Sequence, residues 1–297
     1  MSVATELQNY NDGLLDAYDA VSAKGGTIPA QKNLANLPDA IDSISGGGST
    51  VNPYITFSTE SGTNNLKLAK KLNGLNLEYS YDTTTWSTWD LTTPLEFGGA
   101  TKLYMRGTNA TLATSGSNYT QFAFSNNTVL VDCSGRINKL LKYDDEAYDY
   151  TVTADYCFYY LFRDCKALKT APELSAVGLR SYCYANMFKD CTSLIAAPEL
   201  PSTTLVSGCY GNMFSGCTSL TTAPELPATT LASNCYNSMF NGCTNLTYVK
   251  CLAEYSLANC TNWLNNVSAT GTFVKKTGVT WDSGSSGIPT GWTVEEV

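Results

Sequence analysis

The chain has 297 residues, of which 43% are hydrophobic, so it is long enough for one to three domains with hydrophobic cores. Its 18 basic and 26 acidic residues give a net charge of −8, which disfavours electrostatic capture of nucleic acid or of an anionic membrane. It contains no histidine and no GxxxxGK or GxGxxG motif, so we expect no histidine-based catalytic or metal site and no cofactor.

The chain also shows no sign of membrane insertion or export. No apolar run approaches the roughly 20 residues that cross a bilayer. The first residues lack the basic segment and the apolar core of a secretory signal. We therefore expect the chain to be released into the cytosol in which it is made.

Residues 1–45 are predicted to form a helical attachment or oligomerisation module. Apolar residues recur three and four positions apart on one helical face, Gly25 and Gly26 end this helix, and Pro38 opens a second one. The predicted seam consists of Val3, Leu7, Tyr10, Leu14, Val21, Leu37, Ile41 and Ile44. Two such stripes cannot form a core alone, so we expect them to join copies of the chain, a trimer being one option, or to dock on a larger assembly. The alternative is a small helical hairpin packed on the next domain.

A glycine-rich linker, 46–50, precedes a predicted antiparallel β-sandwich at 51–130. The sandwich is expected because apolar and polar residues alternate, as in Leu77-Glu78-Tyr79-Ser80-Tyr81, and because turn residues separate the runs. Its aromatic residues either fill the core or include a platform on which sugars stack. They are Trp86, Trp89, Tyr104, Tyr119, Phe122 and Phe124.

After a connector and N-terminal cap at 131–156, the chain becomes periodic over 157–272, and a C-terminal cap follows at 273–297. Units beginning CFYYLFRDC, CYANMFKDC, CYGNMFSGC and CYNSMFNGC start 26 residues apart, at Cys157 and its equivalents. Such a unit cannot bury its apolar face alone, whereas stacked neighbours build a continuous core. The period therefore predicts a solenoid.

Within one unit, Cys183, Met187 and Cys191 follow each other at intervals of four residues, which predicts a short helix with an inward apolar stripe. The extended segment Leu194–Leu200 is predicted to supply a strand. Together these elements predict a multidomain α+β protein. It would comprise an N-terminal helical segment, a small antiparallel sandwich and a leucine-rich-repeat-like α/β solenoid.

The cysteines are interpreted as small buried hydrophobic residues. No CxxC pair is present, which disfavours a zinc ribbon or a thioredoxin site. Equivalent cysteines on neighbouring coils could approach within disulfide distance. Because eleven is an odd number and no secretory signal indicates an oxidising compartment, we expect reduced thiols.

The repeat CYGNMFSGCTSLTTAPELPATTLASN, at 209–234, resembles the BspA-like leucine-rich repeat, and the flanks at 104–122 and near the C-terminus are similar to segments found beside such repeats. The first 45 residues are similar to N-terminal modules of phage tail and fibre proteins. The two resemblances imply a virion structural protein in a tail fibre, baseplate or head fibre. Its N-terminal module would bind other virion proteins and its solenoid would bind a glycan or protein of the bacterial surface. The alternative is a bacterial cell-surface adhesin.

The candidate ligand surface consists of repeat positions that differ between units or that should line up when the units stack. They are Tyr184, Tyr210, Tyr236, Asn186, Asn212, Asn237, Thr203, Thr204, Thr229 and Thr230. The tyrosines either stack sugars or stack on one another between coils, and the polar residues either bind a ligand or are simply solvated.

We do not expect an enzyme. A glycosidase would need two carboxylates in different environments across one cleft. Glu173, Glu199 and Glu225 are instead equivalent positions of successive units, which indicates architecture. The acidic cluster at 144–149 lacks the ligand spacing of a calcium loop, so a solvated turn is expected there.

Overall fold

The computed structural model describes residues 54–145, 150–254 and 259–297. Residues 54–297 form one compact unit. The predicted helical module at 1–45, with all its seam residues from Val3 to Ile44, and the linker at 46–50 lie outside the described residues. No helix in the described part is long and apolar enough to cross a bilayer.

The first part of this unit contains two facing sheets. The strands are β1 Ile55–Ser58, β2 Thr63–Lys70, β3 Leu77–Ser80, β4 Ser87–Thr88, β5 Leu95–Gly98, β6 Leu103–Gly107, β7 Gln121–Phe124 and β8 Val131–Ser134. One sheet has the order β4-β3-β6-β1-β8-β9 and the other the order β5-β2-β7. The ring of Phe57 lies 5.9–6.1 Å from those of Phe97, Phe122 and Phe124 between them, so this layer has an aromatic core.

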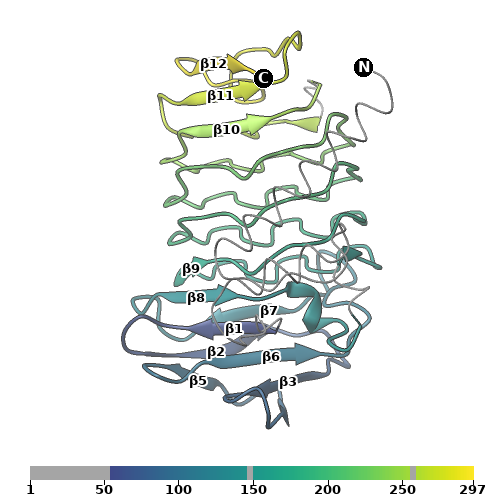
Figure 1. The fold of residues 1–297 in the computed structure, drawn as a ribbon, viewed down its shortest axis with the longest axis vertical. Coiled ribbons are helices and arrows are strands. Elements are labelled where there is room, and N and C mark those ends of the chain that lie inside the picture. Colours follow the sequence, from purple (N-terminus) through teal and green to yellow (C-terminus); the bar gives the residue numbers. More distant parts are fainter. Residues whose placement is uncertain (1–53, 146–149, 255–258) are drawn as a thin grey trace, which may run out of the picture. The chain divides into compact units, whose positions relative to one another are not determined.

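The antiparallel layer passes directly into the repeats. β8 pairs antiparallel with β1 but parallel with β9, Leu168–Thr170, the first strand of the stack. A 3-10 helix, Ile137–Leu140, follows β8. Parallel pairing continues through single bridges, such as Thr170 to Ala196, up to β10 Tyr248–Cys251, β11 Thr272–Lys275 and β12 Thr293–Glu296. Figure 1 shows the coils lying one above another between β9 and β10.

The opposite face of each coil is a row of overlapping β-turns and not a helix. The N–H groups of Met187 and Cys191 donate to carbonyls three residues earlier, those of Tyr184 and Phe188. The N–H groups of Phe188 and Asp190 instead donate to the next coil, to the carbonyls of Met213 and Ser215 at 3.0 and 2.7 Å. Because an α-helix would bond each N–H to the carbonyl four residues earlier, this backbone cannot be one.

The predicted α+β class is therefore wrong. The described residues are almost entirely strand and turn, with no helix of seven or more residues. The inward stripe of Cys183, Met187 and Cys191 does form, and all three are fully buried. The strand expected at Leu194–Leu200 is reduced to the single bridge at Ala196.

Two ladders of stacked aromatic rings run through the interior of the stack. In the first, the rings of Phe162, Phe188, Phe214 and Phe240 are spaced 5.6–5.7 Å apart with interplanar angles of 6–12°. The second ladder consists of Phe158, Tyr184, Tyr210, Tyr236, Trp263 and Trp281, spaced 5.4–6.4 Å apart. Each unit thus contributes one ring to each ladder, which is how a 26-residue period becomes a continuous core.

All eleven cysteines are free and buried. The thiols of Cys191, Cys217 and Cys243 donate to the carbonyls of Phe162, Phe188 and Phe214 at 3.0–3.1 Å, so they bind the coils together as weak donors. Burial raises the pKa of Cys157, Cys209, Cys243 and Cys251 to about 12. These thiols are therefore protonated at neutral pH.

We expect the folded chain to be almost inert to Ellman's reagent at pH 8, because only an accessible thiolate reacts. In guanidinium chloride all eleven thiols should titrate. Rapid reaction of several thiols in the folded chain would contradict the buried arrangement, and fewer than eleven after unfolding without reductant would indicate disulfides.

Candidate functional site

Along the turn face the direction of the side chains repeats every four residues: two consecutive side chains point inward and the next two point outward. Cys183, Tyr184, Met187 and Phe188 are fully buried or nearly so, whereas the outward pair 181–182 is half-buried. The outward pair Ala185 and Asn186 retains 2% and 7% exposure. The second residue of an outward pair has a positive φ, as in Tyr182 (57°) and Asn186 (58°). Asn and Gly adopt this conformation most readily, which explains why Gly208 and Asn212 occupy the equivalent places in the next unit.

These outward residues line a groove of about 250 Å³ across four consecutive coils. We call it the turn-face groove. Its lining consists of Tyr159, Tyr182, Ala185, Asn186, Gly208, Gly211, Asn212, Asn234 and Asn237. The small residues Ala185, Gly208 and Gly211 leave space, the asparagines supply amides, and the tyrosines supply aromatic rings.

Tyr182 is held in place by its neighbours. Its ring stacks on that of Tyr156 at 5.0 Å with an interplanar angle of 10°. It also covers Gly208, where an added Cβ atom would lie 2.3 Å from the ring. Tyr159 contacts Tyr156 and Tyr160, with ring centroids 5.5 and 4.1 Å apart. A cluster of packed rings thus forms one wall of the groove.

The polar groups of the groove are neutral. The structure gives the side-chain amides of Asn186 and Asn212 no hydrogen-bond partner among the described residues, so each can both donate to and accept from a ligand. Burial and the neighbouring Tyr160 raise the pKa of Tyr159 above its usual range, so its hydroxyl stays protonated. None of the described lining residues carries a formal charge, and a neutral, hydroxyl-rich ligand is what such a lining suits.

Several predicted ligand residues lie elsewhere. Tyr184, Tyr210 and Tyr236 are 1–2% exposed inside the second ring ladder, so placing them on the ligand surface was wrong, and the alternative of stacking between coils describes them. Thr203, Thr204, Thr229 and Thr230 are exposed but do not line the groove. Asn186, Asn212 and Asn237 do line it.

The groove also contains four residues that were not predicted from the sequence: Tyr159, Tyr182, Gly208 and Asn234. The signal in the sequence that could have identified them is the four-residue period. Outward pairs begin at 181, 185 and 189 in one unit, and the same positions recur 26 residues later. Of the aromatic residues considered for a sugar platform, Trp89, Phe122 and Phe124 are buried in the sandwich core. Tyr119 instead packs on Tyr160 at 4.8 Å and extends the ring cluster.

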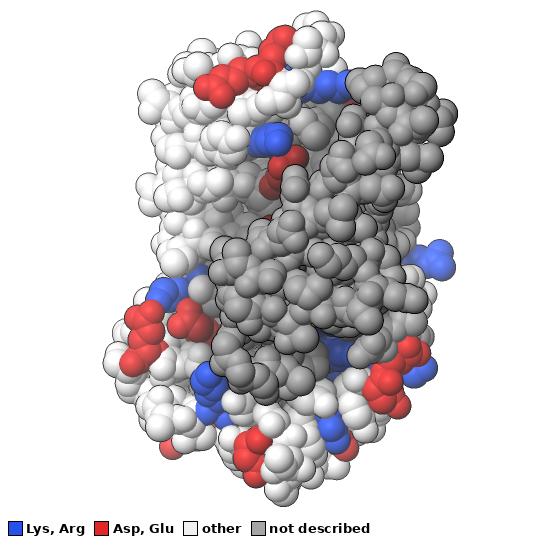
Figure 2. Space-filling model, in the orientation of Figure 1, with Lys and Arg blue, Asp and Glu red and all other residues white. Residues whose placement is uncertain are grey.

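The described part of the chain contains no group of three or more Cys, Asp or Glu side chains arranged to hold a metal ion. Charged side chains are sparse on the visible flank of the middle coils (Figure 2). In comparisons with known proteins, no family model, no curated protein and no solved structure matches this chain.

Proposed function

We propose that the chain is a phage virion structural protein, in a tail fibre, baseplate or head fibre, that adheres to the bacterial surface through its repeat stack. The observation that carries this proposal is the turn-face groove, a neutral site of tyrosine rings and asparagine amides spanning four coils. The resemblance of residues 1–45 to phage tail and fibre modules supports the virion location.

The groove favours a neutral glycan as the ligand. Asparagine amides pair with sugar hydroxyls because they offer a donor and an acceptor side by side. Tyrosine rings offer a flat apolar face with a polar edge, which suits the face of a pyranose. A strongly anionic polymer is disfavoured, since no cation lines the groove and the chain is acidic overall.

In this proposal the N-terminal module binds other virion proteins and joins copies of the chain. A shallow groove binds weakly, and several grooves on one particle raise the overall affinity by orders of magnitude when they engage together. Weak single sites on an oligomer are therefore compatible with firm adhesion.

We propose no catalytic role. Glu173 and Glu225 are both exposed. Glu173 pairs with Arg136 at 3.8 Å, and Glu225 pairs with Lys250 at 3.1 Å, so the two carboxylates belong to separate ion pairs. A glycosidase would instead hold two carboxylates roughly 5–10 Å apart across one cleft.

The proposal is tested by fractionating an induced culture of the source into particles, envelope and cytosol, and by locating the chain by mass spectrometry. We expect it to sediment with virus particles. Enrichment in the envelope, with particles free of the chain, would overturn the virion location and favour a bacterial adhesin.

A further inference from the structure

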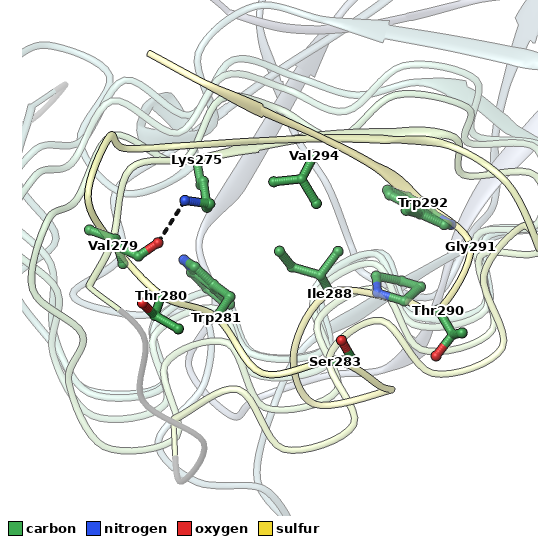
Figure 3. Close-up of a pocket in the computed structure, with 11 residues that line it drawn as sticks. Lys275, Val279, Thr280, Trp281, Ser283, Ile288, Thr290, Gly291, Trp292 and Val294 are labelled. Carbon is green, nitrogen blue, oxygen red and sulfur yellow. Dashed lines mark hydrogen bonds between the residues drawn. The ribbon is translucent and has the colours of Figure 1, made fainter.

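The C-terminal end of the stack contains a second cavity, of about 340 Å³. Figure 3 shows Lys275, Trp281, Ile288, Trp292 and Val294 around a common space at the last coil. Val279 and Pro289 add apolar surface. We call this cavity the cap pocket. It shares no lining residue with the turn-face groove.

The apolar wall of the cap pocket is rigid. The indole N–H of Trp292 donates to the carbonyl of Ser268 at 2.9 Å, and the ring covers Gly271, where an added Cβ would lie 2.8 Å away. Trp281 stacks on Trp263 at 5.4 Å and meets Phe273 edge-on at 5.2 Å. Both indoles are buried, with 8% of Trp281 and 7% of Trp292 exposed, and offer the pocket only a narrow strip of ring. They are fixed before a ligand arrives, which lowers the entropic cost of binding.

The polar groups of the cap pocket carry no uncompensated charge. The Lys275 ammonium donates to the carbonyl of Val279 at 2.7 Å and pairs with Glu296. The exposed residues Thr280, Ser283 and Thr290 place hydroxyls on the lining. An indole wall combined with neutral hydroxyls suits a ring that has an apolar face and a polar rim.

The small volume of the cap pocket and the charges on the neighbouring edge strand disfavour a docked protein segment as the ligand. The volume lies at the small end of pockets for small molecules, which span roughly 300–1,000 Å³. The outermost strand of this sheet, β12, carries Glu295 and Glu296, and charges on an edge strand discourage the addition of another strand.

We propose that the cap pocket is a second binding site, for a neutral pyranose at the end of a glycan, bound against the Trp292 and Trp281 indoles. The choice of a glycan rests on the proposed adhesive function, whereas the site itself rests on the pocket. It would give the stack an end-on contact in addition to the groove on its flank.

Tryptophan fluorescence of the purified full-length chain tests this proposal, because the cap pocket contains two indoles and the turn-face groove contains none. The probes are the methyl glycosides of glucose, galactose, mannose and N-acetylglucosamine. We expect a saturable change in emission with at least one of them, at millimolar concentration. Val294→Arg, on an exposed strand, should fill the pocket and weaken this binding at least about tenfold.

Val297→Arg is the matched control, because Val297 is exposed at the same end but does not line the pocket, and it should leave the titration unchanged. No response to any glycoside, or an equal response in Val294→Arg, would overturn the proposal. So would a dimer in sedimentation that Val294→Arg converts to a monomer, since the pocket would then be a contact between copies. Tyr182→Ala should leave the fluorescence titration intact, so a failure of groove binding and a failure of this site are distinguishable.

Discussion

Phe214→Ala is expected to lower the free energy of unfolding by about 3–5 kcal/mol, the range for removing a large aromatic ring from a core. Phe214 is fully buried and stacks on Phe188 at 5.7 Å and on Phe240 at 5.6 Å. The loss is large because the substitution opens a cavity between two coils, and a local shift of the backbone cannot close this cavity. In addition, both neighbouring rings lose a stacking partner. Urea titration of the full-length chain, followed by far-ultraviolet circular dichroism, measures the effect.

Tyr184→Phe is the matched control in the other ladder. It keeps the ring but removes a hydroxyl that is buried without a hydrogen-bond partner in the described structure. The preceding unit carries Phe158 at the equivalent place, with the two rings 5.5 Å apart. Because an unsatisfied buried hydroxyl is costly, we expect unchanged stability or a gain of up to about 1 kcal/mol. A loss below about 1 kcal/mol in Phe214→Ala would show that the ring ladders are not the core of the stack.

The sequence predicted which repeat residues point inward but not the backbone that carries them. Cys183, Met187 and Cys191 are four residues apart, and an α-helix and a row of overlapping turns share this spacing. Two features could have separated them. First, the buried residues come in adjacent pairs, because Tyr184 follows Cys183 and Phe188 follows Met187, and all four are buried. Glycine or asparagine also recurs every fourth position at 208, 212 and 216, and glycine in a helix interior is unfavourable.

Local alternation was a better guide in the antiparallel part. Strands β1, β3 and β6 occupy segments in which apolar and polar residues alternate. The junction was not predictable in this way, because β8 pairs with β1 on one side and with β9 on the other. Pairing between segments more than 30 residues apart depends on the stacking of the whole coil, which no local pattern encodes.

The candidate site was predicted in part, for the same reason. Asn186, Asn212 and Asn237 were identified because they vary between units, and they lie on the outer side of the turn face. The aligned tyrosines at 184, 210 and 236 belong to the inward pair, one position before the outward pair begins. With a period of four, an error of one residue exchanges the interior and the surface.

Tyr182→Ala is expected to weaken binding of neutral oligosaccharides by tenfold or more, a change of about 1.4 kcal/mol. The ring forms the aromatic wall of the turn-face groove and lies half-buried on the outer side of the stack, so its removal should affect the ligand more than the core. Binding of the full-length chain to an array of neutral oligosaccharides measures the effect. Tyr150→Ala removes an exposed tyrosine outside the groove and should bind like the unaltered chain.

Gly208→Asn separates the shape of the groove from its chemistry. Asn234 occupies the equivalent place in the next unit with a φ of 55°, so the backbone at 208, with a φ of 60°, should accept asparagine. Its Cβ would meet the Tyr182 ring at 2.3 Å, and the ring must therefore turn away from Tyr156. We expect the same loss of glycan binding as in Tyr182→Ala, with a small fall in the urea midpoint because the stacking of Tyr182 on Tyr156 is lost. Full binding by both variants would exclude the groove as the adhesive site, because neither would keep the Tyr182 ring in its place on the wall.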